Sequence, residues 1–221
     1  KHFMDVTNTK EGTFEPPLLL DVNSALGEEY IASMRLAGKY AHEGREWVCR
    51  TVAGILGARI TDKVHNHHNF AWEEEHYGEK LWVVRKGATP AFPNQRGFVG
   101  GSMSENAVIL KGIDSEESKA SLYSTVHGAG RSMGRRQAKG KFKWQTVVEG
   151  EPKRCVRISE GLVKEEDMLD MVSKAGVVLR GGGVDESPHC YKRLSEVLEL
   201  HSKTIEIMHV LKPLGVAMAG D

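Results

Sequence analysis

One histidine in this chain stands where an imidazole could attack a phosphorus atom. His127 follows a β-branched and aromatic run at 122–126, which predicts a buried strand, and it precedes residues 132–139, which predict a helix. Gly128 and Gly130 would let the backbone approach a ligand closely, and the first N–H groups of a helix attract anions. This strand–loop–helix junction therefore predicts a phosphate site with a histidine nucleophile, while an ordinary loop histidine is the alternative. The basic residues of the junction are Arg131, Arg135, Arg136 and Lys139.

A second segment, residues 65–76, concentrates histidine and glutamate. His65, His67, His68 and His76 lie in it together with the run Glu73-Glu74-Glu75. Imidazole and carboxylate groups bind transition metals such as manganese, zinc and nickel. The spacing matches neither a zinc finger nor the H-E-x-x-H pattern. On an extended strand His65 and His67 would share one face and His68 the other. A metal site and a solvated polar loop both remain open.

Two further loops carry small or basic residues at strand ends. Residues 83–91 deliver Arg85 and Lys86 into a turn with glycine and proline, and residues 100–104 form the small-residue turn Gly-Gly-Ser-Met-Ser. Either segment alone could be an ordinary turn. Taken with the histidine loops, they predict a nucleotide or phosphate site that is assembled from several loops.

The ordered motifs of the chain resemble those of the RtcB-type RNA ligases, from about residue 20 onward. The resemblance implies an RtcB-like fold and a GTP- and manganese-dependent reaction. That reaction joins the 3′-phosphate or 2′,3′-cyclic phosphate end of one RNA to a 5′-hydroxyl end, as in tRNA splicing or RNA repair. The matching segments are HHNFAWEEEH (67–76), VRKGATPA (84–91), GGSM (100–103), STVHGAGRSMGRRQAK (124–139), GVDESPHCYK (183–192) and VLKPLGVAMAG (210–220).

The same resemblance implies roles for individual residues. His127 would take up GMP covalently, His68 would be a manganese ligand, and Arg135 would contact an RNA phosphate. Arg85 and Lys86 would be further charge partners of the phosphates. The residues implied to hold the nucleotide are His68, Asn69, Gly100, Gly101, Ser102, Met103, His127, Gly128, Ala129 and Gly130.

The chain departs from the family pattern in three respects. A lysine near the family's carboxyl terminus is absent from Val216–Asp221, and Ala107 stands where a nucleotide-contacting serine is usual. Family members are also considerably longer, and their amino-terminal metal-binding motifs do not occur here. We therefore expect a carboxy-terminal portion of a ligase or a naturally shortened relative. A missing half, a split partner chain or an activating accessory protein would complete it. A non-catalytic nucleotide- or RNA-binding relative and a metal-dependent hydrolase using residues 65–68 are the alternatives.

The composition is that of an ordinary globular protein. Lysine plus arginine and aspartate plus glutamate number 30 each, so RNA binding would depend on local basic patches. No apolar run is long enough for a membrane span, so no membrane partner is expected. Cys49, Cys155 and Cys190 are widely spaced, which predicts reduced thiols in the interior of a cytoplasmic protein.

The hydrophobic pattern predicts an α+β fold of mixed strands lined by helices, in a single domain portion over 1–221 with an irregular lead-in at 1–22. A helix from Ser24 to about His42 is expected to break at Gly44, before a second helix at 46–56. Apolar spacing predicts a last long helix from Ser187-Pro188 to Pro213. The other predicted elements are strands at 81–85, 107–111, 122–126 and 155–158 and a helix at 164–174.

Overall fold

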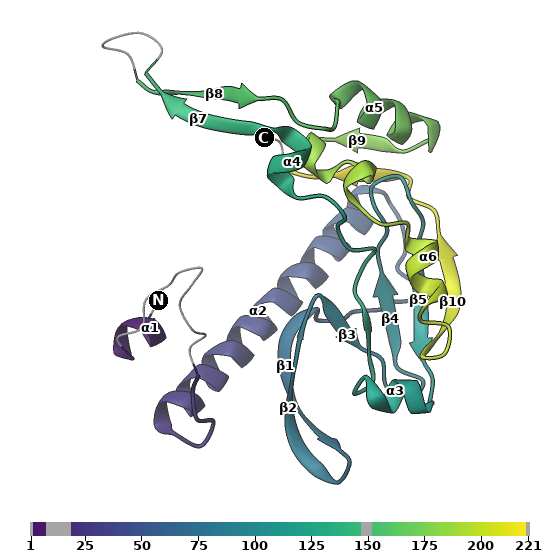
Figure 1. Ribbon diagram of the computed structural model, residues 1–221. Helices are drawn as coiled ribbons and strands as arrows, with labels where there is room; N and C mark the ends of the chain where they lie inside the picture. The colour runs from purple at the N-terminus through teal and green to yellow at the C-terminus, as the bar shows by residue number, and fades with distance from the viewer. Residues whose placement is uncertain (1, 8–18, 147–151, 220–221) are drawn as a thin grey trace. The chain divides into compact units, whose positions relative to one another are not determined.

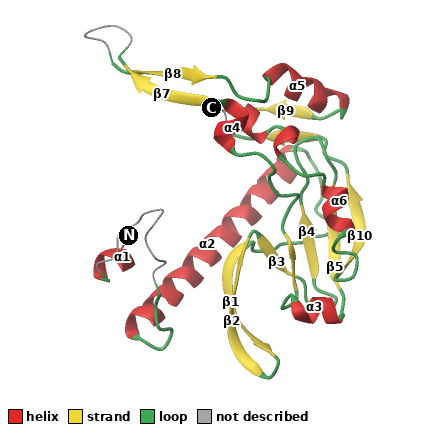
Figure 2. Cartoon of the chain, viewed as in Figure 1, coloured by secondary structure: helices red, strands yellow, loops and turns green. Residues whose placement is uncertain are grey.

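The computed structural model describes residues 2–7, 19–146 and 152–219, and the chain divides into two compact units, residues 1–63 and 64–221. The sequence pattern predicts a single domain portion over 1–221 and no boundary at residue 63. Helices and strands both contribute, and the strands pair in parallel and antiparallel fashion, so the predicted α+β class is confirmed. Figure 2 shows the distribution of helices and strands along the chain.

The first unit is helical. Its elements are α1 (His2–Val6) and α2 (Ala25–Ile55), so the prediction of an irregular segment over 1–22 is wrong for residues 2–6. Ser24 caps α2 by accepting a hydrogen bond from the Gly27 N–H at 3.0 Å. The predicted break at Gly44 does not occur. A single interior glycine costs about 1 kcal/mol, which good helix formers on both sides offset.

The second unit contains a three-stranded antiparallel sheet in the order β10-β5-β4. Its strands are β4 (Arg96–Val99), β5 (Ala107–Gly112) and β10 (Ile205–Leu211). Alternate residues of β5 are buried, and α6 (Leu194–Glu199) adds Leu194 and Leu198 to the same hydrophobic core. Figure 1 shows α6 alongside β5 and β10.

Three two-stranded antiparallel pairs and one parallel pair complete the strands of the described residues. The antiparallel pairs are β1 (Asn69–His76) with β2 (Glu79–Lys86), β3 (Ala88–Pro90) with β6 (Ser124–Val126), and β7 (Lys141–Gln145) with β8 (Arg154–Ser159). The parallel pair is β9 (Val178–Arg180) with β11 (Gly215–Ala217). The strands predicted at 81–85, 107–111 and 155–158 are therefore confirmed as elements. The strand predicted at 122–126 is confirmed only over Ser124–Val126, because Leu122 and Tyr123 have positive φ and lie in a turn.

The remaining helices are short. They are α3 (Glu116–Ala120), α4 (Arg135–Lys139), α5 (Glu165–Lys174) and the 3₁₀ turns η1 (Val184–Glu186) and η2 (Pro188–Cys190). The helix predicted at 164–174 is confirmed by α5. Its Met168 and Val172 pack with Met103 and Val177 in a second core cluster.

The predicted long helix after Ser187 is wrong. The chain instead forms η2, then α6, and then β10, which pairs with β5. The apolar spacing of Leu194, Val197 and Leu198 fits a helix, but Ile205 and its successors complete the sheet edge. Strand pairing with β5 outweighs the local helical pattern there.

Two of the three cysteines contradict the predicted interior packing. Cys190 is buried, whereas Cys49 and Cys155 are exposed, and all three are free thiols. In the part of the chain that the structure describes, no helix combines the length and apolar character that a membrane span needs.

A buried ion pair holds the β1–β2 hairpin against the segment that leads to β6. The Arg85 guanidinium, 2% exposed, donates to both carboxylate oxygens of Glu74 at 2.7 and 2.9 Å. It also donates to Ser124 Oγ and to the Leu122 carbonyl, each at 2.8 Å. Its predicted role as a phosphate partner is therefore wrong, because protein acceptors already surround this buried group.

The Glu74 carboxyl is the partner whose removal tests this pair. Burial by itself raises the pKa of Glu74, but hydrogen bonds and charge from Arg85 and His76 outweigh it and lower that pKa below its ordinary value. Glu74→Gln leaves a buried guanidinium unpaired, and we expect it to lower the free energy of unfolding by about 3–5 kcal/mol at neutral pH.

Chemical denaturation at several pH values measures this loss in the free energy of unfolding. Because the folded pKa is lowered, the Glu74 contribution is complete above the unfolded Glu pKa of about 4.3 and is lost as the pH falls through the folded value. The difference between wild type and Glu74→Gln should therefore shrink in acid. The exposed Glu73→Gln is the matched control, and an equal effect of both variants would contradict the account.

Candidate functional site

Gly87 joins the two histidines that the sequence singles out. Its N–H donates to the His68 carbonyl at 2.8 Å, and its own carbonyl lies 2.7 Å from His127 Nδ1. The imidazole rings of His68 and His127 stack, with centroids 5.1 Å apart and planes inclined by 11°. Both side chains are exposed. The structure thus brings together residues from two segments that lie far apart in the sequence.

The pairing of β3 with β6 explains why Gly87 and His127 lie side by side. β3 and β6 pair with Ala88 opposite Val126, so the residues just outside the pair, Gly87 and His127, face each other. Gly87 has φ of 75°, a left-handed conformation that favours glycine. The sequence predicts Gly87 only as part of an ordinary turn. Its hydrogen bond to His127 could not be predicted, because no local signal shows that β3 pairs with β6.

The Gly87 carbonyl fixes the protonation pattern of His127. A carbonyl oxygen only accepts hydrogen bonds, so Nδ1 must carry the proton and donate it. In the neutral ring, Nε2 then holds the unshared electron pair. An exposed nitrogen of this kind can act as a nucleophile, and the Gly87 carbonyl would stabilise the positive charge that develops on the ring.

The glycine-rich turn at 100–103 lies against the loop that follows His127. Gly100 and Gly128 form a parallel bridge, and the Ala129 N–H donates to the Gly100 carbonyl at 3.2 Å. Ala129 is buried in the main core, whereas a Cβ placed on Gly130 would meet open space. The backbone around Gly130 is therefore open to approach, while that of Ala129 serves the fold.

Two residues predicted to hold the nucleotide have side chains that serve the fold. Ser102 is buried and its hydroxyl donates to the Glu105 carboxylate at 3.1 Å. Met103 is 5% exposed and packs against α5. Any contact that they make with a ligand would have to be through the backbone. Asn69, by contrast, begins β1 and is exposed.

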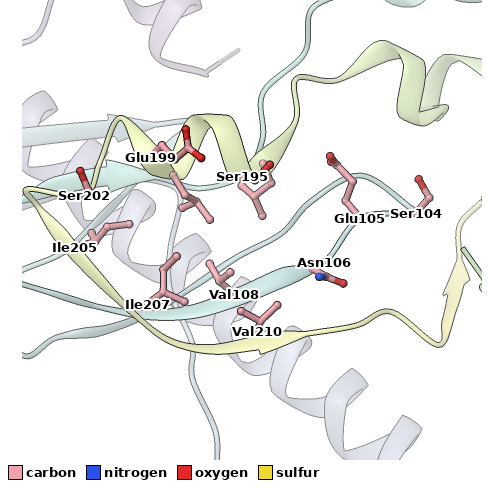
Figure 3. Close-up of a pocket in the computed structure, with 12 residues that line it drawn as sticks. Ser104, Glu105, Asn106, Val108, Ser195, Glu199, Ser202, Ile205, Ile207 and Val210 are labelled. Carbon is pink, nitrogen blue, oxygen red and sulfur yellow. The ribbon is translucent and has the colours of Figure 1, made fainter.

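A groove of about 740 Å³ lies beside this turn, between α6, β10 and residues 104–106 (Figure 3). Apolar side chains such as Val108 and Ile207 form its floor, and Glu105, which holds Ser102, lies at one end. His68 and His127 do not line it. This groove is therefore separate from the histidine pair.

Arg135 is held by carboxylates. Its guanidinium donates to Asp185 Oδ2 at 2.7 Å and also pairs with Glu186, while its side chain remains 61% exposed. Burial alone raises the pKa of Asp185, but the hydrogen bond from Arg135 and the charge of Lys139 outweigh it and lower that pKa. The charge predicted for an RNA phosphate is thus already matched within the protein.

The Arg131 side chain also makes hydrogen bonds within the protein. It donates to the Asp185 carbonyl at 2.6 Å and to the Tyr191 hydroxyl at 3.0 Å, and its guanidinium lies over the Tyr191 ring. The helix expected from residue 132 begins only at Arg135 and has five residues. The predicted anion site at its first turn is therefore not supported.

The histidine-rich segment does not form a metal cluster in the described residues. The His67 ring stacks on Phe70 with centroids 5.1 Å apart and contacts His65 and Trp72 edge-on. Within residues 2–7, 19–146 and 152–219, no group of three or more His, Cys, Asp or Glu side chains could hold a metal ion. The residues present therefore do not fit a complete manganese site, and the aromatic packing of His65 and His67 disfavours the hydrolase alternative.

A carbonyl-anchored, exposed histidine beside glycine-rich turns, in an α+β unit, is an arrangement that suits attack on phosphorus. Comparison with known proteins then gives the family. The family model described as "tRNA-splicing ligase RtcB" matches residues 14–219, and the chain belongs to that family.

Curated relatives agree with this assignment. RNA-splicing ligase RtcB of Escherichia coli strain K12 is 30% identical over 197 residues, which cover 84% of this chain and 42% of that protein. tRNA-splicing ligase RtcB of Archaeoglobus fulgidus is 30% identical over 226 residues, covering 89% and 43%. RNA-splicing ligase RtcB1 of another Escherichia coli strain, ATCC 25922, is 30% identical over 151 residues, covering 68% and 31%. The chain spans less than half the length of these relatives.

Gly87→Ala tests the link between the two histidines. The space beside Gly87 would admit a methyl group, whose closest neighbour is His127 Cε1 at 3.5 Å, so the cost comes from the positive φ. We expect the free energy of unfolding to fall by about 1–2 kcal/mol. Gly78→Ala, with φ of 79° in the β1–β2 turn and no atom nearby, should cost about the same.

The ring resonances of the histidines separate the two variants. Only Gly87→Ala should shift the NMR signals of the His68 and His127 rings. Unchanged ring signals in Gly87→Ala, or equal shifts in Gly78→Ala, would contradict the bridging role of Gly87.

Proposed function

We propose that this chain provides the nucleotidyl-transfer histidine of a GTP- and manganese-dependent RNA ligase. The reaction joins RNA 3′-phosphate or 2′,3′-cyclic phosphate ends to 5′-hydroxyl ends through GMP bound covalently to His127. The observation that carries this proposal is the hydrogen bond from His127 Nδ1 to the Gly87 carbonyl, which leaves Nε2 as an exposed nucleophile. The curated relatives named as RNA-splicing ligases support it.

In the first step, Nε2 of His127 attacks the α-phosphorus of GTP. A bond forms between Nε2 and phosphorus, and the bond to the β-phosphate oxygen breaks, releasing pyrophosphate. The ring becomes positively charged, and the Nδ1 proton shared with Gly87 stabilises it. A 2′,3′-cyclic phosphate end would first be opened by water to the 3′-phosphate. A 3′-phosphate oxygen then takes GMP as the Nε2–phosphorus bond breaks, and the 5′-hydroxyl oxygen attacks the 3′-phosphorus and releases GMP. Two covalent transfers replace one difficult displacement.

The nucleotide would lie over the stacked histidines. His68, Asn69 and His127 are exposed there, and the open backbone at Gly130 would admit phosphate oxygens. We propose Gly100, Gly101 and Gly128 as backbone contacts, with Ser102, Met103 and Ala129 supporting the same turns from beneath. Lys86 is exposed next to Gly87 and is proposed as a further charge partner of the phosphates. Arg135 would contact an RNA phosphate while it remains paired with Asp185 and Glu186.

Manganese would neutralise charge on the phosphate oxygens when bound. We propose His68 as one ligand. Because the described residues do not form a complete metal site, the other ligands would come from a further segment or from a partner chain. An activating accessory protein and a cytoplasmic location also remain proposals.

His127→Ala tests the nucleophile. The chain is incubated with manganese and α-labelled GTP and then separated by denaturing electrophoresis. Once the remaining metal ligands are supplied, we expect a covalent label in the wild type and none in His127→Ala, with little change in the free energy of unfolding because the side chain is exposed. The exposed His209→Ala is the matched control. A label that persists in His127→Ala would refute the assignment.

The same assay distinguishes the binding-module alternative. GTP that binds without covalent transfer at any manganese concentration would contradict catalysis by the chain alone, and would mean either that the chain needs a further metal-binding segment or that it is a nucleotide-binding relative.

His68→Ala tests the proposed metal ligand. Loss of one ligand should raise the manganese concentration for half-maximal labelling by about tenfold or more, since even outer partners of a metal site contribute about 10- to 100-fold. His67→Ala, which removes an imidazole that packs on Phe70, serves as the control. An unchanged manganese dependence in His68→Ala would contradict the ligand role.

A further inference from the structure

The β7–β8 hairpin presents aromatic and basic side chains that the proposed reaction does not use. Every residue of β7 is exposed, and so is every residue of β8 except the half-buried Val156. Trp144 is 66% exposed and Phe142 is 44% exposed. Aromatic rings left in water in this way contribute little to the stability of the fold, so the hairpin is a candidate binding surface.

The two strands are strongly basic. They carry Lys141, Lys143, Arg154 and Arg157 and contain no aspartate or glutamate. The whole chain, in contrast, has equal numbers of basic and acidic residues. A local excess of positive charge on a neutral protein is the kind of patch that attracts a polyanion.

Register places the rings and the charges together. Trp144 pairs with Cys155 and Phe142 with Arg157, and because side chains alternate along a strand, these two pairs share one face. The Arg157 guanidinium lies 5.3 Å from the centre of the Phe142 ring. Lys143 and Arg154 belong to the opposite face. Arg157 therefore lies on the same face as two aromatic rings that are about two residues apart, and it also pairs with Glu160 at 3.0 Å.

The base of the hairpin is fixed to the segment that follows His127. The Leu162 N–H donates to the Gln137 carbonyl at 3.0 Å, and the Val163 N–H donates to the Ala138 carbonyl at 3.1 Å. Gly161 packs so closely that an added Cβ would lie 2.0 Å from the Ala138 carbonyl oxygen. Figure 1 shows β7 and β8 running side by side away from α4. The base of the hairpin is thus anchored by hydrogen bonds. β7 begins directly after α4, the short helix that follows the HGAGR loop (127–131).

We propose that this hairpin binds single-stranded RNA. Phe142 and Trp144 would stack two bases, and the long side chains of Lys141 and Lys143 would reach phosphates around the edge of the hairpin, while Arg157 would contact a phosphate only in competition with Glu160. A membrane surface fits less well, because Arg157 shares the aromatic face and leaves no apolar face to insert. This inference rests on the proposed function in that an RNA ligase must hold RNA ends, and it assigns the holding surface to residues outside the nucleotide site.

Fluorescence anisotropy of a labelled oligouridine, titrated with the full 221-residue chain, tests the proposal. Trp144→Ala should weaken binding about tenfold, in the range that stacking on one base contributes, while Trp144→Phe should retain most of it. Trp47→Ala is the matched control, since Trp47 is 67% exposed on α2, and it should change nothing. Lys143→Gln should reduce the slope of log affinity against log salt by about 0.7.

An abasic oligonucleotide of the same length separates stacking from charge. It should bind the wild type more weakly than oligouridine binds Trp144→Ala, because it loses the stacking on Phe142 as well as that on Trp144. Equal affinity of the wild type for both ligands, or unchanged affinity of Trp144→Ala for oligouridine, would overturn the proposal while leaving RNA ligation possible through another surface. Absence of any oligouridine binding would also overturn it, and covalent labelling of His127 would then test the proposed function independently.

Discussion

The candidate site depends on one residue. Gly87 donates its N–H to the main-chain carbonyl of His68 and accepts from the His127 ring through its own carbonyl, so a single backbone position links the two histidine segments and orients the His127 imidazole. That position is reached because β3 pairs with β6, and because buried Arg85 fixes β2 to the segment that leads into β6. The reactive nitrogen is thus oriented by main-chain geometry, which is stiffer than a side-chain partner would be.

Positive charge in this protein has two distinct uses. Arg85 is buried, Arg131 is half-buried and Arg135 is exposed, but all three pair with carboxylates, carbonyls or hydroxyls and bind parts of the fold to one another. The cations of β7 and β8 are exposed instead, and aromatic rings accompany them there. A buried arginine without its acid partner would be costly, so these pairings are a requirement of folding before they are a property of any site.

Some of this could be predicted from the sequence. The apolar run of β5 and the β-branched run before His127 identify strands, and glycines after the strand identify a loop, because these signals are local. The break at Gly44 and the long helix after Ser187 were wrong since neighbouring helix formers and the pairing of Ile205–Leu211 with β5 decide those segments. Gly87, Glu74 and Asp185 were missed as determinants of the site for the same reason: their partners are distant in sequence.

The most direct test is the protonation pattern of the His127 ring. Long-range ¹H–¹⁵N correlation spectra of the chain labelled at histidine report which ring nitrogen carries the proton, and the signals that vanish in His127→Ala identify the residue. The account predicts a neutral ring protonated at Nδ1, with Nε2 unprotonated. A neutral ring protonated at Nε2 would contradict it, because the nitrogen assigned to attack phosphorus would then have no free electron pair.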